Sequence, residues 1–234
     1  MGPASDFALP EGMKAAISLS FDGGLLEHWE LVAPILAEHE IRATFFVTVP
    51  NLLENPEAWR KVAAAGHEIG SHSHLGISTN GNLPAWTLEM VDEDLRMTDK
   101  GILEILGGRV ESFALSGSET TCAEGDYAPS LRKRFSGLRS SLPGPNEVNE
   151  VDLYNVGSSF WRDLVGPIES YLPAHGQWTV PVFERFFDAD FGAAEEDLRV
   201  LIGYLKRRED IWVAPFGEVV SHIAANRGVG ENAI

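Results

Sequence analysis

The sequence predicts an α/β fold, in which a parallel β-sheet is covered by helices, and two patterns carry this prediction. Short apolar runs rich in β-branched and aromatic residues recur along the chain, and segments with helical periodicity separate them. Strands that alternate with helices pair in parallel, because each helix returns the chain to the same end of the sheet. A chain of 234 residues built in this way forms an open doubly wound sheet or a closed barrel.

The expected strands are short runs in which Ala, Ile, Val and Phe predominate. They are long enough to cross a sheet and too short for a typical helix. In chain order they cover residues 15–21, 43–49, 68–71, 111–115 and 211–214.

Two segments show the clearest helical pattern. Residues 194–207 carry apolar side chains at spacings of i, i+3, i+4 and i+7, with acidic residues in the first turn and basic residues in the last, as the helix dipole favours. Residues 86–106 carry a similar apolar stripe. We interpret both stripes as faces that pack on the core.

The chain is expected to form one domain, since it contains no internal repeat and no low-complexity tract. Residues 140–149 are rich in turn formers and predict a long loop, but the composition is the same on both of its sides. The domain is expected to span residues 13–226, after an N-terminal extension of residues 1–12 and before a C-terminal tail of residues 227–234.

The charge balance excludes several classes of function. The 35 Asp and Glu residues outnumber the 18 Lys and Arg residues and give a formal net charge of −17, so we expect no nucleic-acid partner. No apolar run approaches the roughly 18 residues of a membrane span, and the N-terminus lacks a signal-peptide pattern. We therefore expect a cytoplasmic protein, or an exported one if a signal peptide was removed. The single Cys122 excludes an intramolecular disulfide and a Cys-based zinc cluster.

A carboxylate stands where the first expected strand ends. Asp22 is followed by Gly23 and Gly24, and the carboxyl ends of parallel strands form the edge at which ligands bind in α/β folds. Two glycines there would allow a ligand to approach the backbone closely. The alternative is a turn in which Asp22 caps the next helix.

Histidines gather after the third expected strand and in a later segment. If the strand continued, alternation would place His72 and His74 on one side, where two neutral imidazoles can share a metal ion. Further on, an apolar run ends in His175 beside Trp178, which suits a general acid at a strand end next to an aromatic wall. The alternatives are hydrogen-bonded structural histidines and a loop residue.

Taken together, these segments resemble one known family. Ser20 to Gly24 is similar to the first motif of the polysaccharide deacetylases (the NodB homology domain, carbohydrate esterase family 4), and Gly66 to Ser73 is similar to the second. Residues 210–219 are similar to the last strand and helix of one branch of the family, and the resemblance extends from about Met13 to Ala224.

The resemblance implies a distorted (β/α) barrel of about seven units and hydrolysis of an amide bond, such as deacetylation of an N-acetylated sugar. Active family members hold a divalent metal, often zinc, with one Asp and two His. Carried over by position, Asp22 is the base, His72 is a metal ligand and His175 is the late acid. Trp178 beside His175 would bind substrate.

Three departures from the family pattern concern the site itself. The metal-binding Asp falls at Gly23, and the second metal His falls at Gly76. The third motif aligns with Phe113 to Ser118 and lacks the family's Arg, Pro and Tyr. A zinc ion could be bound only if His74 supplied the missing imidazole and Asp22 turned to become the carboxylate ligand. The alternative is a site without metal.

Three functions therefore stay open. The first is a deacetylase-like hydrolase acting on a carbohydrate. The second is a metal-independent hydrolase of cyclic amides or ureides on the same fold, with Asp22 activating water. The third is a catalytically inactive relative that binds carbohydrate, with Trp86, Trp161 and Trp178 available to stack on sugar rings or to fill the core.

Overall fold

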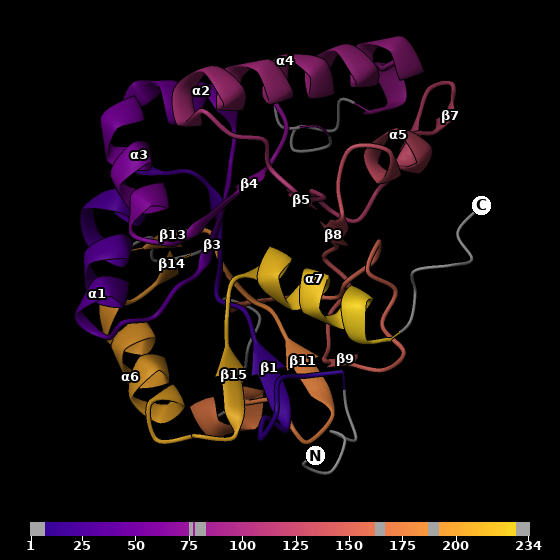
Figure 1. Ribbon diagram of the computed structural model, residues 1–234. Helices are drawn as coiled ribbons and strands as arrows, with labels where there is room; N and C mark the ends of the chain where they lie inside the picture. The colour runs from indigo at the N-terminus through magenta and orange to yellow at the C-terminus, as the bar shows by residue number, and fades with distance from the viewer. Residues whose placement is uncertain (1–7, 75–76, 78–82, 162–166, 187–191, 228–234) are drawn as a thin grey trace.

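A curled parallel sheet forms the centre of the molecule. The computed structural model describes residues 8–74, 77, 83–161, 167–186 and 192–227. Seven parallel strands lie in the order β10-β12-β2-β3-β4-β5-β8, and a second sheet has the order β15-β1-β11-β9 (Figure 1). The main-sheet strands are β2 (Ser20–Gly23), β3 (Thr44–Val47), β4 (Glu68–Ser71), β5 (Ser112–Ala114), β8 (Gly137–Arg139), β10 (Ser159–Phe160) and β12 (Pro181–Phe183). The second sheet contains β1 (Ala15–Ile17), β9 (Asn146–Glu147), β11 (Gln177–Thr179) and β15 (Ile211–Val213).

Helices cover the outside of the main sheet, and one closes its inside. The outer helices are α1 (Ala33–Glu38), α2 (Val49–Glu54), α3 (Pro56–Ala64), α4 (Leu88–Leu106), α5 (Ala128–Arg132) and α6 (Glu195–Leu205). Helix α7 (Phe216–Asn226) packs its buried face against the interior cluster of the two sheets (Figure 1). The other elements of the described residues are three helical turns (His28–Val32, Leu83–Ala85, Ile168–Tyr171) and two short strand pairs. β6 (Thr121–Cys122) pairs antiparallel with β7 (Gly125–Asp126), and β13 (Arg185–Phe186) pairs in parallel with β14 (Gly192–Ala193).

The structure confirms the predicted barrel-like α/β fold, and one expected strand is two strands in the structure. The expected strand over residues 15–21 divides in two, because β1 pairs with β15 and β11 in one sheet while β2 pairs with β3 and β12 in the other. The helices expected over 86–106 and 194–207 are α4 and α6, each one to two residues shorter at one or both ends.

Alternation along the strands separates two apolar layers. On β3, Phe45 points outward into the cluster beneath the helices, and Phe46 points inward. Inside the barrel, the Phe216 ring of α7 packs edge-on to Phe46 at 5.8 Å and beside Trp178 at 5.2 Å. Trp178 is fully buried, and its indole N–H donates to the hydroxyl of Ser18 at 3.0 Å. Trp178 is therefore a core residue, not a surface for stacking sugars.

Helix α7 is fixed to the sheet by a half-buried carboxylate. Glu68 on β4 accepts hydrogen bonds from Ser112 (2.6 Å), Thr44 (2.7 Å) and the backbone N–H of Gly217 (2.8 Å). Burial raises the pKa of Glu68 against the effect of these three donors. The contact joins three neighbouring strands to the first turn of the helix that closes the barrel.

Substitution of Gly70 by Ala is expected to destabilise the barrel interior. A Cβ at this position would lie 2.5 Å from the ring carbons of Phe46, so the ring has to move. Such overpacking costs about 1–3 kcal/mol of unfolding free energy, which urea unfolding would measure. Gly108→Ala is the matched control, because a Cβ there meets no atom within 4 Å and its φ is not positive. Equal stability of the two variants would contradict the packing argument.

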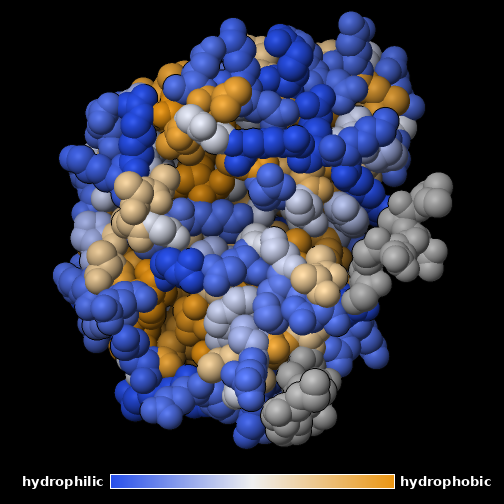
Figure 2. Space-filling model, viewed as in Figure 1, coloured by the Kyte–Doolittle hydropathy of each residue, from blue (hydrophilic) through white to orange (hydrophobic). Residues whose placement is uncertain are grey.

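Most of the face shown in Figure 2 is hydrophilic, and hydrophobic side chains show mainly in the hollows between. Among the helices of the described residues, none is both long and apolar enough to cross a membrane.

Candidate functional site

Three side chains from different strands meet at the carboxyl edge of the main sheet. Asp22 is the third residue of β2, Arg139 is the last residue of β8, and His72 directly follows β4. Because all seven strands run in parallel, these strand ends lie on the same side of the sheet. Asp22 is only 6% exposed and Arg139 is fully buried, so the charged groups lie below the molecular surface.

The charge of Asp22 is balanced by Arg139. One terminal nitrogen of the guanidinium, Nη2, donates a short hydrogen bond to Asp22 Oδ2, and the other, Nη1, donates to Ser158 Oγ at 3.1 Å. The guanidinium also lies 5.3 Å from the centre of the Phe46 ring. Ser158 in turn donates to the carbonyl of Ser140 at 2.5 Å. The arginine is thereby held from several sides, and it fixes the orientation of the carboxylate.

Two polar atoms of this pair are left without a hydrogen bond. Asp22 Oδ1 and Arg139 Nε are both buried and have no partner in the described part of the chain. Buried polar atoms are almost always paired, so an acceptor and a donor left open at a ligand-binding edge are suited to a water molecule or a substrate.

The charges of Asp22 and Arg139 both affect the pKa of His72. Its Nδ1 is 3.0 Å from the carbonyl of Ala114, which can only accept, so Nδ1 carries the proton and Nε2 is the acceptor. Burial lowers the pKa of His72, and Arg139 lowers it further, while Asp22 and the hydrogen bond to Ala114 act in the opposite direction. The imidazole is therefore neutral near pH 7.

The structure does not bring His74 to His72. The expectation assumed that the strand continues, but β4 ends at Ser71, and Ser73 has a left-handed backbone with φ of 67°. This turn breaks the alternation that would have put both imidazoles on one side. His74 instead donates its backbone N–H to Asp94 and lines a hollow between α2 and α4.

His175 also lies away from Asp22. The sequence interpretation placed it at the end of a strand, whereas in the structure it precedes β11 and so lies at the amino end of the parallel strands. Its side chain is 63% exposed, and Nε2 is 3.9 Å from a carboxylate oxygen of Asp210, which precedes β15. The structure therefore unites Asp22 with His72 but not with His175 or Trp178.

The described residues do not fit the metal that the family resemblance implies. They contain no group of three His, Cys, Asp or Glu side chains that could hold a metal ion. Gly23 offers no ligand, and one oxygen of Asp22 is engaged by Arg139. Gly76, the other family ligand position, lies outside the described residues. Zinc in catalytic sites usually has three protein ligands. Near Asp22, the described residues place His72 and also His28, but both ring nitrogens of His28 are hydrogen-bonded to the backbone of Leu25 and Glu184.

Arg139 is the site residue that sequence reasoning missed. The family's arginine was expected in the segment Phe113 to Ser118, on the strand before, and was absent there. The structure supplies a guanidinium from β8, the neighbour of β5. All three residues of Gly137–Arg139 are buried, but this burial is visible only in the structure, and the sequence carries no local signal for this arginine.

The fold is a barrel-like α/β fold with a buried carboxylate at the carboxyl edge of its parallel strands, and its family is known from sequence similarity. A sequence model of the polysaccharide deacetylase family matches residues 10–128, which are 119 of the 234 residues. This chain belongs to the polysaccharide deacetylase family. It is 33% identical over 88 residues, 37% of its length, to a chitooligosaccharide deacetylase of Rhizobium leguminosarum bv. trifolii.

Solved structures agree with this fold over nearly the whole chain. A polysaccharide deacetylase candidate from Mycobacterium smegmatis superposes with a TM-score of 0.70 at 20% identity, covering 93% of this chain and 92% of the other. A pseudoenzyme of carbohydrate esterase family 4 from Bacillus anthracis superposes with a TM-score of 0.58 at 16% identity, covering 88% of this chain and 66% of the other. At such identities the likeness concerns the fold. Among curated relatives the matched part is short, covering 39% of the Rhizobium protein and 26% of a Bacillus subtilis protein.

Proposed function

We propose that this protein hydrolyses the acyl carbon–nitrogen bond of an N-acetylated sugar, with Asp22 as the general base. The observation that supports this proposal is the carboxylate of Asp22, buried at the carboxyl edge, held by Arg139 and open at Oδ1. A carboxylate held in this way accepts a proton without first having to be oriented. The family assignment and the chitooligosaccharide deacetylase relative supply the substrate class.

The chemistry uses the groups that the structure brings together. Asp22 Oδ1 takes a proton from a water molecule, and the resulting hydroxide adds to the acetyl carbon. When the C–N bond breaks, the same carboxyl group returns its proton to the leaving amine, so atoms and charge balance. Arg139 keeps Oδ2 in place throughout, and the Nε2 lone pair of His72 can accept a hydrogen bond from the attacking water.

Asp22→Asn is expected to lower acetate release from N-acetylglucosamine oligomers by at least about 100-fold, because an amide cannot accept the proton. Glu196→Gln is the matched control, since it makes the same chemical change on an exposed residue of α6. Assays run in chelator and again with zinc or cobalt, together with elemental analysis of the purified chain, test whether a divalent metal is held. Equal activity of Asp22→Asn and the wild type would contradict the assignment of the base.

A second candidate function is carbohydrate binding without turnover. The specific observation that favours it is the missing ligand set: Gly23 replaces a ligand, and His74 faces a different hollow. Saturable binding of the same oligomers with no acetate released in chelator or with added metal would establish this function.

The metal-independent hydrolase of cyclic amides and ureides is tested in the same way. These compounds are assayed in chelator, and turnover of these alone would establish that function.

A further inference from the structure

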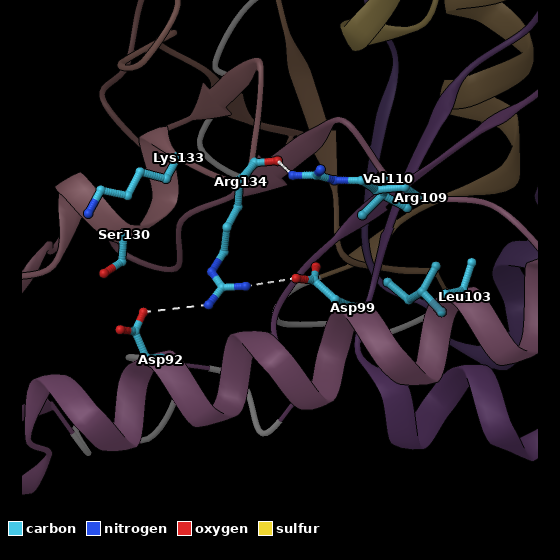
Figure 3. Close-up of a pocket in the computed structure, with 9 residues that line it drawn as sticks. Asp92, Asp99, Leu103, Arg109, Val110, Ser130, Lys133 and Arg134 are labelled. Atoms are coloured by element: carbon cyan, nitrogen blue, oxygen red, sulfur yellow. Dashed lines mark hydrogen bonds and ion pairs between the residues drawn. The ribbon is translucent and has the colours of Figure 1, made fainter.

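A cleft outside the edge site separates α4 from α5 and the segments that lead into β5 and β8. Its volume is about 490 Å³, which lies within the range of small-molecule sites. Arg109 and Val110 precede β5, and Lys133 and Arg134 precede β8, so this wall lies at the amino ends of the strands, opposite Asp22. Figure 3 shows the cleft, which is lined by Asp92, Asp99, Ile102, Leu103, Arg109, Val110, Ser130, Lys133 and Arg134.

One cation of the cleft is already neutralised. Arg134 extends between the walls, with one guanidinium nitrogen 2.9 Å from Asp99 and another 3.7 Å from Asp92 (Figure 3). The ion pairs join the segment before β8 to α4. If the cleft served only to hold these elements together, this arginine and the two acids of α4 would be sufficient.

Two further cations in the cleft have no acidic partner in the described part of the chain. Lys133 is exposed and forms no ion pair or side-chain hydrogen bond there, and Arg109 donates only to the carbonyl of Arg134, at 2.5 Å. The hydroxyl of Ser130, half-buried and one turn before Lys133 on α5, is likewise without a side-chain hydrogen bond among these residues. In a chain with a net charge of −17, cations left free in one cleft with a free hydroxyl are available to an external anion.

The floor of the cleft is apolar. Ile102 and Val110 are buried in it, and Leu103 is 54% exposed beside them. Figure 3 shows Leu103, Val110 and Arg109 toward one end of the cleft and Ser130 and Lys133 toward the other. A ligand that suits both ends has a charged group at one end and an apolar or ring portion at the other.

We propose that this cleft binds a small organic anion of about the size of a monosaccharide. Its phosphate or carboxylate group contacts Lys133 and Ser130, and the rest of the molecule extends past Arg134 toward Arg109 and covers Leu103. The proposal is independent of the hydrolysis at Asp22, because the two sites lie at opposite ends of the parallel strands.

Titration of the full chain with three probes tests the proposal. Glucose 6-phosphate and glucuronate carry the two anionic groups on the same ring, and glucose carries neither. Isothermal titration calorimetry is expected to detect saturable binding of at least one anionic probe and none of glucose, and the stronger anion identifies the preferred group. Amide NMR shifts are expected at residues 109–110 and 130–134 and not around Asp22.

Charge-neutralising variants locate the site. Lys133→Gln is expected to weaken binding about tenfold, as loss of one charged contact does. Arg109→Gln is expected to weaken binding less, because Arg109 lies at the other end of the cleft and contacts the uncharged part of the ligand. Lys61→Gln is the matched control, because Lys61 is an exposed cation on α3, outside this cleft. Unchanged affinity in Lys133→Gln and Arg109→Gln, equal loss in Lys61→Gln, or no saturable binding of either anionic probe would overturn the proposal.

Discussion

Replacement of Arg139 by Met is expected to lower the free energy of unfolding by about 3–5 kcal/mol, the cost of leaving a buried charge without its partner. Arg139 is fully buried and Asp22 is 6% exposed, so water cannot take over the role of the guanidinium. The variant also removes the hydrogen bond to Ser158 and the contact with the Phe46 ring. Urea unfolding followed by circular dichroism gives the difference.

A double substitution separates the lost charge pair from the lost packing. Asp22→Asn combined with Arg139→Met removes both charges, so the double variant is expected to be more stable than Arg139→Met alone. Arg139→Lys keeps the charge but loses the forked geometry, and its stability is expected to lie between those of the wild type and Arg139→Met. A loss below about 1 kcal/mol in Arg139→Met would show that the ion pair does not hold Asp22.

The same pair bears on the family's metal. A cation beside a carboxylate can be a metal ion or a guanidinium, and in this chain β8 supplies the guanidinium directly to Asp22. Gly23 offers no carboxylate that could attract a second cation. Arg139 thus supplies the cation that balances the charge of Asp22 at this edge.

The local pattern of the chain predicted most of the fold. Apolar runs such as residues 43–49 correspond to strands, because a strand buried on both faces needs side chains of that kind on every position. The periodicity over 86–106 predicted α4 for the equivalent reason. The motif around Asp22 predicted a site at the end of β2, where the structure places this residue.

Long-range partners and local turns were not predictable in this way. Arg139 is 117 positions from Asp22, and nothing in the sequence near either residue indicates that they meet. The separation of His72 from His74 depends on one positive φ at Ser73, a conformation that non-glycine residues rarely adopt. His175 was misplaced because its strand begins after it, and the boundaries of short strands are poorly determined by composition.

Acidification from pH 6.5 to pH 4 is expected to destabilise the fold through His28, which is completely buried. Burial lowers the pKa of His28 to about 4, whereas in the unfolded chain an imidazole has a pKa of about 6.5. The folded state therefore keeps this residue neutral while the unfolded state gains a proton. Its contribution to stability is fully present above pH 6.5, and about 3 kcal/mol of it is lost as the pH falls to 4.

The contacts of His28 explain why protonation is unfavourable. Nδ1 accepts the backbone N–H of Leu25 at 3.2 Å, and Nε2 donates to the carbonyl of Glu184 at 3.0 Å, so a second proton on Nδ1 would break the first bond. His28→Gln can keep one donor and one acceptor but does not titrate. The difference in unfolding free energy between wild type and variant, measured by urea unfolding at several pH values, isolates His28, since the lowered pKa values of His67 and His72 affect both proteins alike. Between pH 6.5 and pH 4, the wild type is expected to lose about 3 kcal/mol of unfolding free energy relative to His28→Gln. An equal loss in both proteins would contradict the assignment to His28.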